Sequence, residues 1–180
     1  MATIYDVLAH IGQRMPHLGM VKAFKLAYYA QAWHATWEGR PLYTEHTEAW
    51  AMGPVCRAGW TAVKRGDQRP THSLTGSESS VVDAVIKFYG QMDGRTLGEL
   101  SHNEDPWRDA RGDVPDGQRC DEEISVASMR RYYTRKLMRG EPVPERPTTP
   151  AEPVPDEVAM KVAREQADRW REALELLADR

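Results

Sequence analysis

The chain has 180 residues, of which 41% are hydrophobic and 28% charged, and its net charge is −3. This composition is typical of one globular domain with an appendage; it excludes a disordered chain, and the two cysteines without a CxxC pair exclude a disulfide framework. Residues 141–180 carry six basic and ten acidic side chains, which leaves 18 and 17 before them, so nucleic-acid binding lacks electrostatic support. Because the chain has neither a run of about 18 apolar residues nor a cationic start, we expect a cytoplasmic protein that binds no membrane.

The N-terminal part of the sequence predicts two helices. Thr3 and Asp6 form a capping pattern for a first helix that ends before Pro16. A second helix is expected over about residues 21–37, with a stop at Gly39. Apolar residues cover most of its circumference, which is typical of a helix at the centre of a domain.

A short strand is expected next. The stretch HTEAWAMGPV, residues 46–55, alternates polar and apolar side chains and predicts one strand that ends at a Gly53-Pro54 turn. Helical patterning resumes at about residues 55–64.

Three further helices follow in the main domain. Thr75 with Glu78 forms a capping box for a helix that closes at Gly90, and Thr96 with Glu99 repeats the device. The helix that begins at Thr96 is short and ends near His102. The last helix of the main domain starts near Ser125.

The C-terminal part changes composition abruptly. Residues 141–156, EPVPERPTTPAEPVPD, hold six of the 12 prolines, which predicts an extended spacer without helix or sheet. Residues 157–180 predict an amphipathic helix whose apolar stripe has coiled-coil spacing and needs a partner, either its own domain or another chain. We therefore predict a mainly α fold, in which a compact helical domain over residues 1–140 with a small β element precedes a proline-rich linker and a C-terminal helix.

The segment SHNEDPW, residues 101–107, is the best place to look for a catalyst. His102, Glu104 and Asp105 are suitable as metal ligands or as an acid/base pair, and would support a small metal-dependent hydrolase. The alternative is a helix end, with Trp107 packed inward. Nucleophile and nucleotide motifs are missing, as is the P-C-x-x-C pair of zinc deaminases. We favour a chain that is not an enzyme and that needs no metal or other cofactor.

A basic helix near the end of the main domain is a candidate binding surface. The run MRRYYTRKLMR, residues 129–139, interleaves basic side chains with two tyrosines, a mixture that suits RNA or an acidic protein surface, although a solvated helix face gives the same pattern. We place a protein partner first, with Arg131 and Arg135 as candidate contacts.

Two blocks of the sequence resemble one known family. KLAYYAQAWHATWEGRPLYTEHTEAWAMGPV, residues 25–55, and LGELSHNEDPW, residues 97–107, are similar to the two motifs of the Panacea domain family, also described as SocA-like or GepA-like phage-associated proteins. The resemblance spans residues about 3–138. Its motif positions, which we expect to be mainly structural, are Lys25, Tyr28, Tyr29, Gln31, Trp33, Trp50, Gly53, Pro54, His102, Glu104, Pro106 and Trp107.

The resemblance implies a type II antitoxin that binds and neutralises a toxin encoded beside it, including alarmone-synthetase-like toxins in some members. Some relatives are thought to act instead as adaptors that deliver the toxin to a protease. Neither role needs a catalytic residue. As contacts with the toxin we expect Trp170, Leu174 and Leu177 on the C-terminal helix, and secondarily Arg131 and Arg135.

Overall fold

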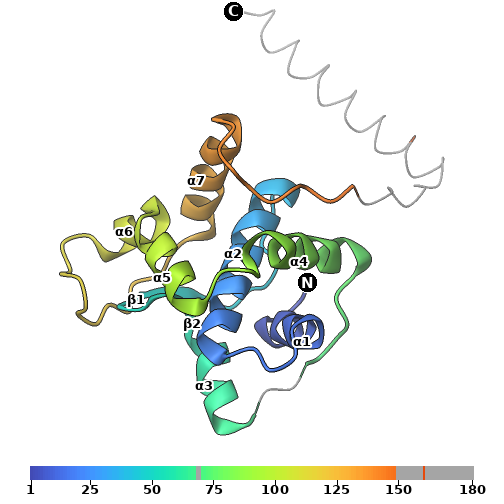
Figure 1. The fold of residues 1–180 in the computed structure, drawn as a ribbon, viewed down its shortest axis with the longest axis horizontal. Coiled ribbons are helices and arrows are strands. Elements are labelled where there is room, and N and C mark those ends of the chain that lie inside the picture. Colours follow the sequence, from blue (N-terminus) through green and yellow to red (C-terminus); the bar gives the residue numbers. More distant parts are fainter. Residues whose placement is uncertain (68–69, 149–159, 161–180) are drawn as a thin grey trace, which may run out of the picture. The chain divides into compact units, whose positions relative to one another are not determined.

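The computed structural model describes residues 1–67, 70–148 and Met160, and in these residues it shows seven helices and one two-stranded sheet (Figure 1). The elements are α1 (Ile4–Arg14), α2 (Met20–Glu38), β1 (Thr47–Trp50), β2 (Gly53–Cys56), α3 (Arg57–Arg65), α4 (Gly76–Tyr89), α5 (Gly94–His102), α6 (Asp105–Arg111) and α7 (Val126–Met138). The predicted mainly α fold with a small β element is confirmed.

Helix α2 is the centre of the domain, as predicted. Thirteen of its 19 residues are buried, and α1, α4, α5, α7 and β2 all pack against it. Figure 1 shows α2 in the middle of the domain with the other elements around it. Each large apolar side chain that is fully buried contributes about 1.5–3 kcal/mol, so this one helix organises most of the core. It ends at Gly39, whose φ of 71° is left-handed.

Local sequence fixes the starts of α1 and α4. The Thr3 hydroxyl accepts from the Asp6 amide at 3.3 Å while the Asp6 carboxylate accepts from the Thr3 amide at 2.8 Å. Thr75 and Glu78 repeat this reciprocal pair at 3.3 and 3.0 Å. Both predicted capping boxes are confirmed, and such caps contribute about 1 kcal/mol each.

The cap predicted for α5 is wrong. Asp93, not Thr96, is the N-cap residue, and its carboxylate accepts from the Thr96 amide at 2.7 Å. Thr96 and Glu99 therefore lie inside the helix, where Glu99 accepts from Arg95 at 2.9 Å. Asp93 is the better cap because its carboxylate carries a full charge at the positive end of the helix dipole.

The β element is a hairpin rather than the single predicted strand. β1 and β2 pair antiparallel, with Thr47 opposite Cys56 and Trp50 opposite Gly53. Gly53 and Pro54 consequently lie in the second strand, and α3 starts two residues later than predicted. The outer edge of β1 is covered by the segment before α7, where the Ala49 amide donates to the Glu122 carbonyl at 2.9 Å.

Beyond α7, residues 141–148 contain neither helix nor strand. Pro144 is buried, and the Arg146 guanidinium donates to the Trp37 carbonyl at 2.9 Å. The chain divides into two units, residues 1–147 and 148–180, and the rest of the predicted spacer and C-terminal helix lies outside the described residues except for Met160. No helix in the described part of the chain is long and apolar enough to cross a membrane.

Candidate functional site

An aromatic cluster joins three helices at the centre of the domain. Tyr29 and Trp33 of α2 meet Tyr89 of α4 and Tyr133 of α7, with the rings of Tyr29 and Tyr89 stacked at 4.1 Å and those of Trp33 and Tyr133 5.1 Å apart. Trp33 Nε1 donates to the Tyr89 hydroxyl at 3.2 Å. Such aromatic pairs stabilise by about 0.5–1.5 kcal/mol beyond their burial, and the motif residues Tyr29 and Trp33 lie in the buried core.

Glu104 is a carboxylate buried beside this cluster. Only 1% of its surface is exposed, the Tyr133 hydroxyl donates to Oε2 at 2.6 Å, and Lys136 Nζ lies 3.7 Å from Oε1. Burial raises the pKa of Glu104 to about 7, against the opposing effects of the Tyr133 hydrogen bond and the Lys136 charge. A carboxyl that changes charge near neutral pH therefore links α6 to α7.

Lys25 is a second buried charge, and it lies beneath the β-hairpin. Its Nζ donates to the Pro54 carbonyl at 3.1 Å, and burial lowers the pKa of Lys25 to about 7. Gly53 has φ 92°, and a Cβ added there would lie 2.5 Å from Lys25 Nζ and 2.7 Å from Ser101 Oγ. Glycine is therefore needed at position 53 of the first motif, because the backbone there passes close to a buried ammonium.

Gln31 binds the backbone of the chain just before the hairpin. Its Oε1 accepts from the Leu42 and Tyr43 amides at 2.7 and 3.1 Å, and its Nε2 donates to the Tyr43 carbonyl at 2.8 Å. All of these groups are buried, so the side chain supplies the hydrogen bonds that a neighbouring strand would otherwise make. This motif residue is structural.

The second motif fixes α6 against the hairpin. Trp107 Nε1 donates to the Trp50 carbonyl at 2.9 Å, and the His102 ring stacks on Trp107 with the ring centres 4.1 Å apart. Arg111 continues the attachment by donating to the Ala49 carbonyl at 2.9 Å. The helix itself was not predicted: Pro106 lies in its first turn, where proline needs no hydrogen-bond partner for its nitrogen.

The three side chains considered for catalysis face different neighbours. His102 stacks on Trp107, Glu104 accepts from Tyr133, and the Asp105 carboxylate accepts from Arg135 at 2.6 Å. Burial and the nearby Lys25 charge lower the pKa of His102. Among the described residues, no group of three His, Cys, Asp or Glu side chains is placed to hold a metal ion. This geometry gives neither an acid/base pair nor a metal site.

The comparison with known families agrees with the motif positions. Residues 24–108 match the family model described as Antitoxin SocA-like, Panacea domain. Residues 24–108 carry a SocA-like Panacea domain. The match begins in α2, includes the hairpin and α3 to α5, and ends in α6, so it is shorter at both ends than the span expected from the motifs. No curated protein and no solved structure gives a match.

Helix α7 packs on the Panacea domain but lies beyond the matched residues. Of the candidate partner contacts on it, Arg131 is exposed and has no ion pair among the described residues, whereas Arg135 pairs with Asp105. The other candidates, Trp170, Leu174 and Leu177, lie outside the described residues.

Sequence reasoning missed the residues that complete these sites from a distance. Tyr89, Arg111 and Lys136 contact motif residues, although none of them belongs to a motif. An indirect signal existed for Tyr133 and Lys136, because both lie in the run 129–139 that stands out for its basic and aromatic side chains.

Proposed function

We propose that this chain is the antitoxin of a toxin–antitoxin pair and that it neutralises its toxin by direct protein–protein binding. The observation that carries the proposal is the match of residues 24–108 to an antitoxin-like domain family. The chain acts as a binding protein and not as an enzyme, in the cytoplasm, where its toxin is made.

The use of the polar motif residues supports a binding role. Lys25 donates to a backbone carbonyl, and Gln31 donates to a backbone carbonyl and accepts from two backbone amides. Glu104 accepts from the Tyr133 hydroxyl. Each is at most 2% exposed, so a substrate in solution does not reach them. Their hydrogen bonds stabilise the Panacea domain, so we place the contacts with the toxin on the surface of the domain.

Neutralisation by occlusion requires a stable interface over the toxin's active site. A standard interface buries about 1,600 Å² in total, and a few central anchors supply most of its binding energy. We propose Trp170, Leu174 and Leu177 as anchors, with Arg131 and Arg135 as further contacts on the main domain. The proline-rich linker then raises the effective concentration of the C-terminal segment once the main domain is bound.

Co-expression with the product of the adjoining gene tests this function. The proposal predicts that the adjoining product alone stops growth, that the full chain restores growth, and that the two proteins co-purify. Deletion of residues 141–180 is expected to abolish or weaken both effects. Rescue without co-purification, together with a fall in the toxin level that depends on a host protease, would indicate a proteolytic adaptor instead.

A further inference from the structure

The charged side chains of helix α7 are all basic. With its C-cap Arg139, it contains five basic residues and no acidic one, although the whole chain has more acidic than basic side chains. The basic residues are Arg130, Arg131, Arg135, Lys136 and Arg139. Helices that merely face water usually mix both signs, because opposite charges four residues apart stabilise them.

The helical spacing places part of this charge beside an exposed apolar side chain. Met129 and Tyr133 are buried against the core. Residues 131, 135 and 138 recur at i, i+4 and i+7, which puts them on the opposite face. Met138 is 82% exposed, and Leu137 beside it is 44% exposed. Arginine and methionine together are residues that protein interfaces favour.

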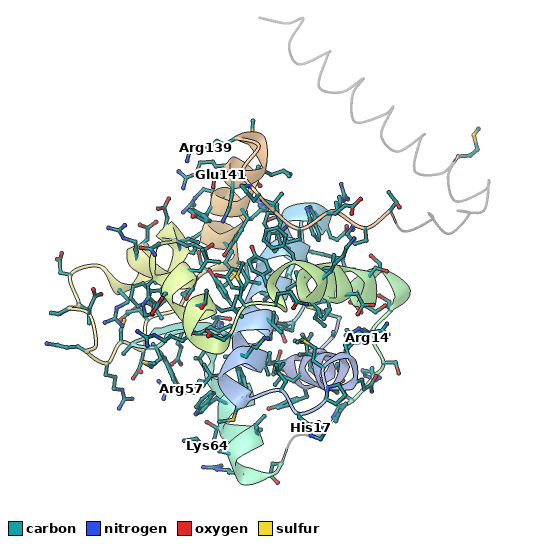
Figure 2. The ribbon with its side chains drawn as sticks, in the orientation of Figure 1. Arg14, His17, Arg57, Lys64, Arg139 and Glu141 are labelled. Atoms are coloured by element: carbon teal, nitrogen blue, oxygen red, sulfur yellow. The ribbon has the colours of Figure 1, made fainter. Side chains whose placement is uncertain are left out.

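The ion pairs of the helix leave this face positive. Lys136 is directed inward to Glu104, and Arg135 pairs with Asp105 at 2.6 Å. Arg139 lies 3.8 Å from Glu141. Figure 2 labels these last two residues, which lie at the end of the helix. Arg131 has no such partner among the described residues.

The same contacts favour a protein over a nucleic acid as the partner. Asp105 and Glu141 each pair with one of the cations, so the helix does not present the continuous row of unpaired charges that favours binding along a phosphate backbone. The exposed Met138 would gain nothing from phosphates, but it would be buried at the centre of a protein interface.

We propose that the α7 face, formed by Arg131, Arg135 and Met138, is a docking surface for an acidic patch on the toxin, with Met138 inserted into an apolar depression between its carboxylates. This inference rests on the proposed function and adds a contact on the described domain to those proposed for the C-terminal segment. Helix α7 lies outside residues 24–108, so the proposed surface is separate from the part of the chain that matches the family model.

The test measures the affinity of the purified full chain for the purified product of the adjoining gene. Arg131→Glu combined with Arg135→Glu is expected to weaken binding at least about tenfold and to reverse the direction of its salt dependence. Met138→Ala is expected to weaken binding about tenfold without changing the salt dependence. The matched control, Lys64→Glu with Arg95→Glu, makes the same change of charge on exposed positions of α3 and α5 and is expected to stay within about threefold of the unsubstituted chain.

Melting curves of each variant separate lost binding from lost folding, and Arg131→Ala with Met138→Ala provides a milder variant should the charge reversal unfold the chain. The inference is overturned if the toxin binds the unsubstituted chain and the α7 variants equally well, a result that leaves the proposed function standing. It is also overturned if the α7 variants lose affinity for a short DNA duplex but keep their affinity for the toxin. Failure of the unsubstituted chain to bind the toxin overturns both proposals.

Discussion

Glu104→Gln is predicted to change how the stability of the domain depends on pH. The pKa of Glu104 is raised from 4.5 to about 7 in the folded chain, so between these values the native state binds a proton that the unfolded state has released. Because the native state binds more protons in this range, the free energy of unfolding falls as pH rises. Glutamine keeps the shape and an acceptor for the Tyr133 hydroxyl but does not ionise.

The expected magnitude follows from the size of the pKa difference. At 1.36 kcal/mol per unit, moving from below pH 4.5 to above pH 7 lowers the free energy of unfolding by about 3 kcal/mol through Glu104 alone. This is a large part of the roughly 5–15 kcal/mol that holds a typical domain together. Glu104→Gln is therefore expected to be more stable than the unsubstituted chain at about pH 8 and close to it near pH 5.

Urea unfolding followed by tryptophan fluorescence measures this difference. Other groups titrate in the same range, and Lys25 acts in the opposite direction, since its pKa is lowered to about 7 and its effect raises stability as pH increases from about 7 to 10.5. These contributions are shared by both proteins and cancel in their difference. If the two stability curves run parallel between about pH 5 and 8, Glu104 does not titrate as described and the reasoning is wrong.

Three further substitutions test the contacts of the fold by chemical denaturation. Gln31→Leu leaves three buried backbone groups without partners and is expected to lower the free energy of unfolding by about 3 kcal/mol or more. Equal stability of the two chains would show that these three hydrogen bonds are dispensable. Gly39→Ala, where the φ is positive but the space is open, is expected to lower the free energy of unfolding by about 1 kcal/mol. Gly53→Ala is expected to lower it more, because it also places a Cβ against the buried Lys25 ammonium. Equal losses of stability would argue against this close approach. Asp93→Ala is expected to cost about 1 kcal/mol and Thr96→Val much less, and the reverse order would restore Thr96 as the cap.

The parts of the fold that follow from neighbouring residues were predictable. The Thr3 and Thr75 capping boxes and the stop at Gly39 each depend on residues within one helical turn, so the pattern contains all the information required. Helix α2, which is apolar over most of its circumference, could likewise be placed at the centre from its sequence alone.

The hairpin was mispredicted because a Gly-Pro pair usually marks a turn. Here Ala51 and Met52 form the turn, and Gly53 is required by the close approach of Lys25, a residue 28 positions away. Contacts over such a separation leave no local pattern. The same reason hid the Tyr133–Glu104 hydrogen bond, which joins this buried motif glutamate to the aromatic core.

The predicted contacts of the C-terminal segment stay predictions, whereas the position of the candidate acid/base residues is resolved. His102, Glu104 and Asp105 lie within four residues, yet at the junction of α5 and α6 their side chains contact Trp107, Tyr133 and Arg135 respectively. Spacing along the chain alone did not distinguish these arrangements.

A titration of the purified toxin from the adjoining gene with the purified full chain, without any protease present, tests the central claim most directly. Direct neutralisation predicts that the toxin's activity falls in proportion to the added chain and is lost once the chain is in slight molar excess. Full toxin activity at a large excess of folded chain would contradict it.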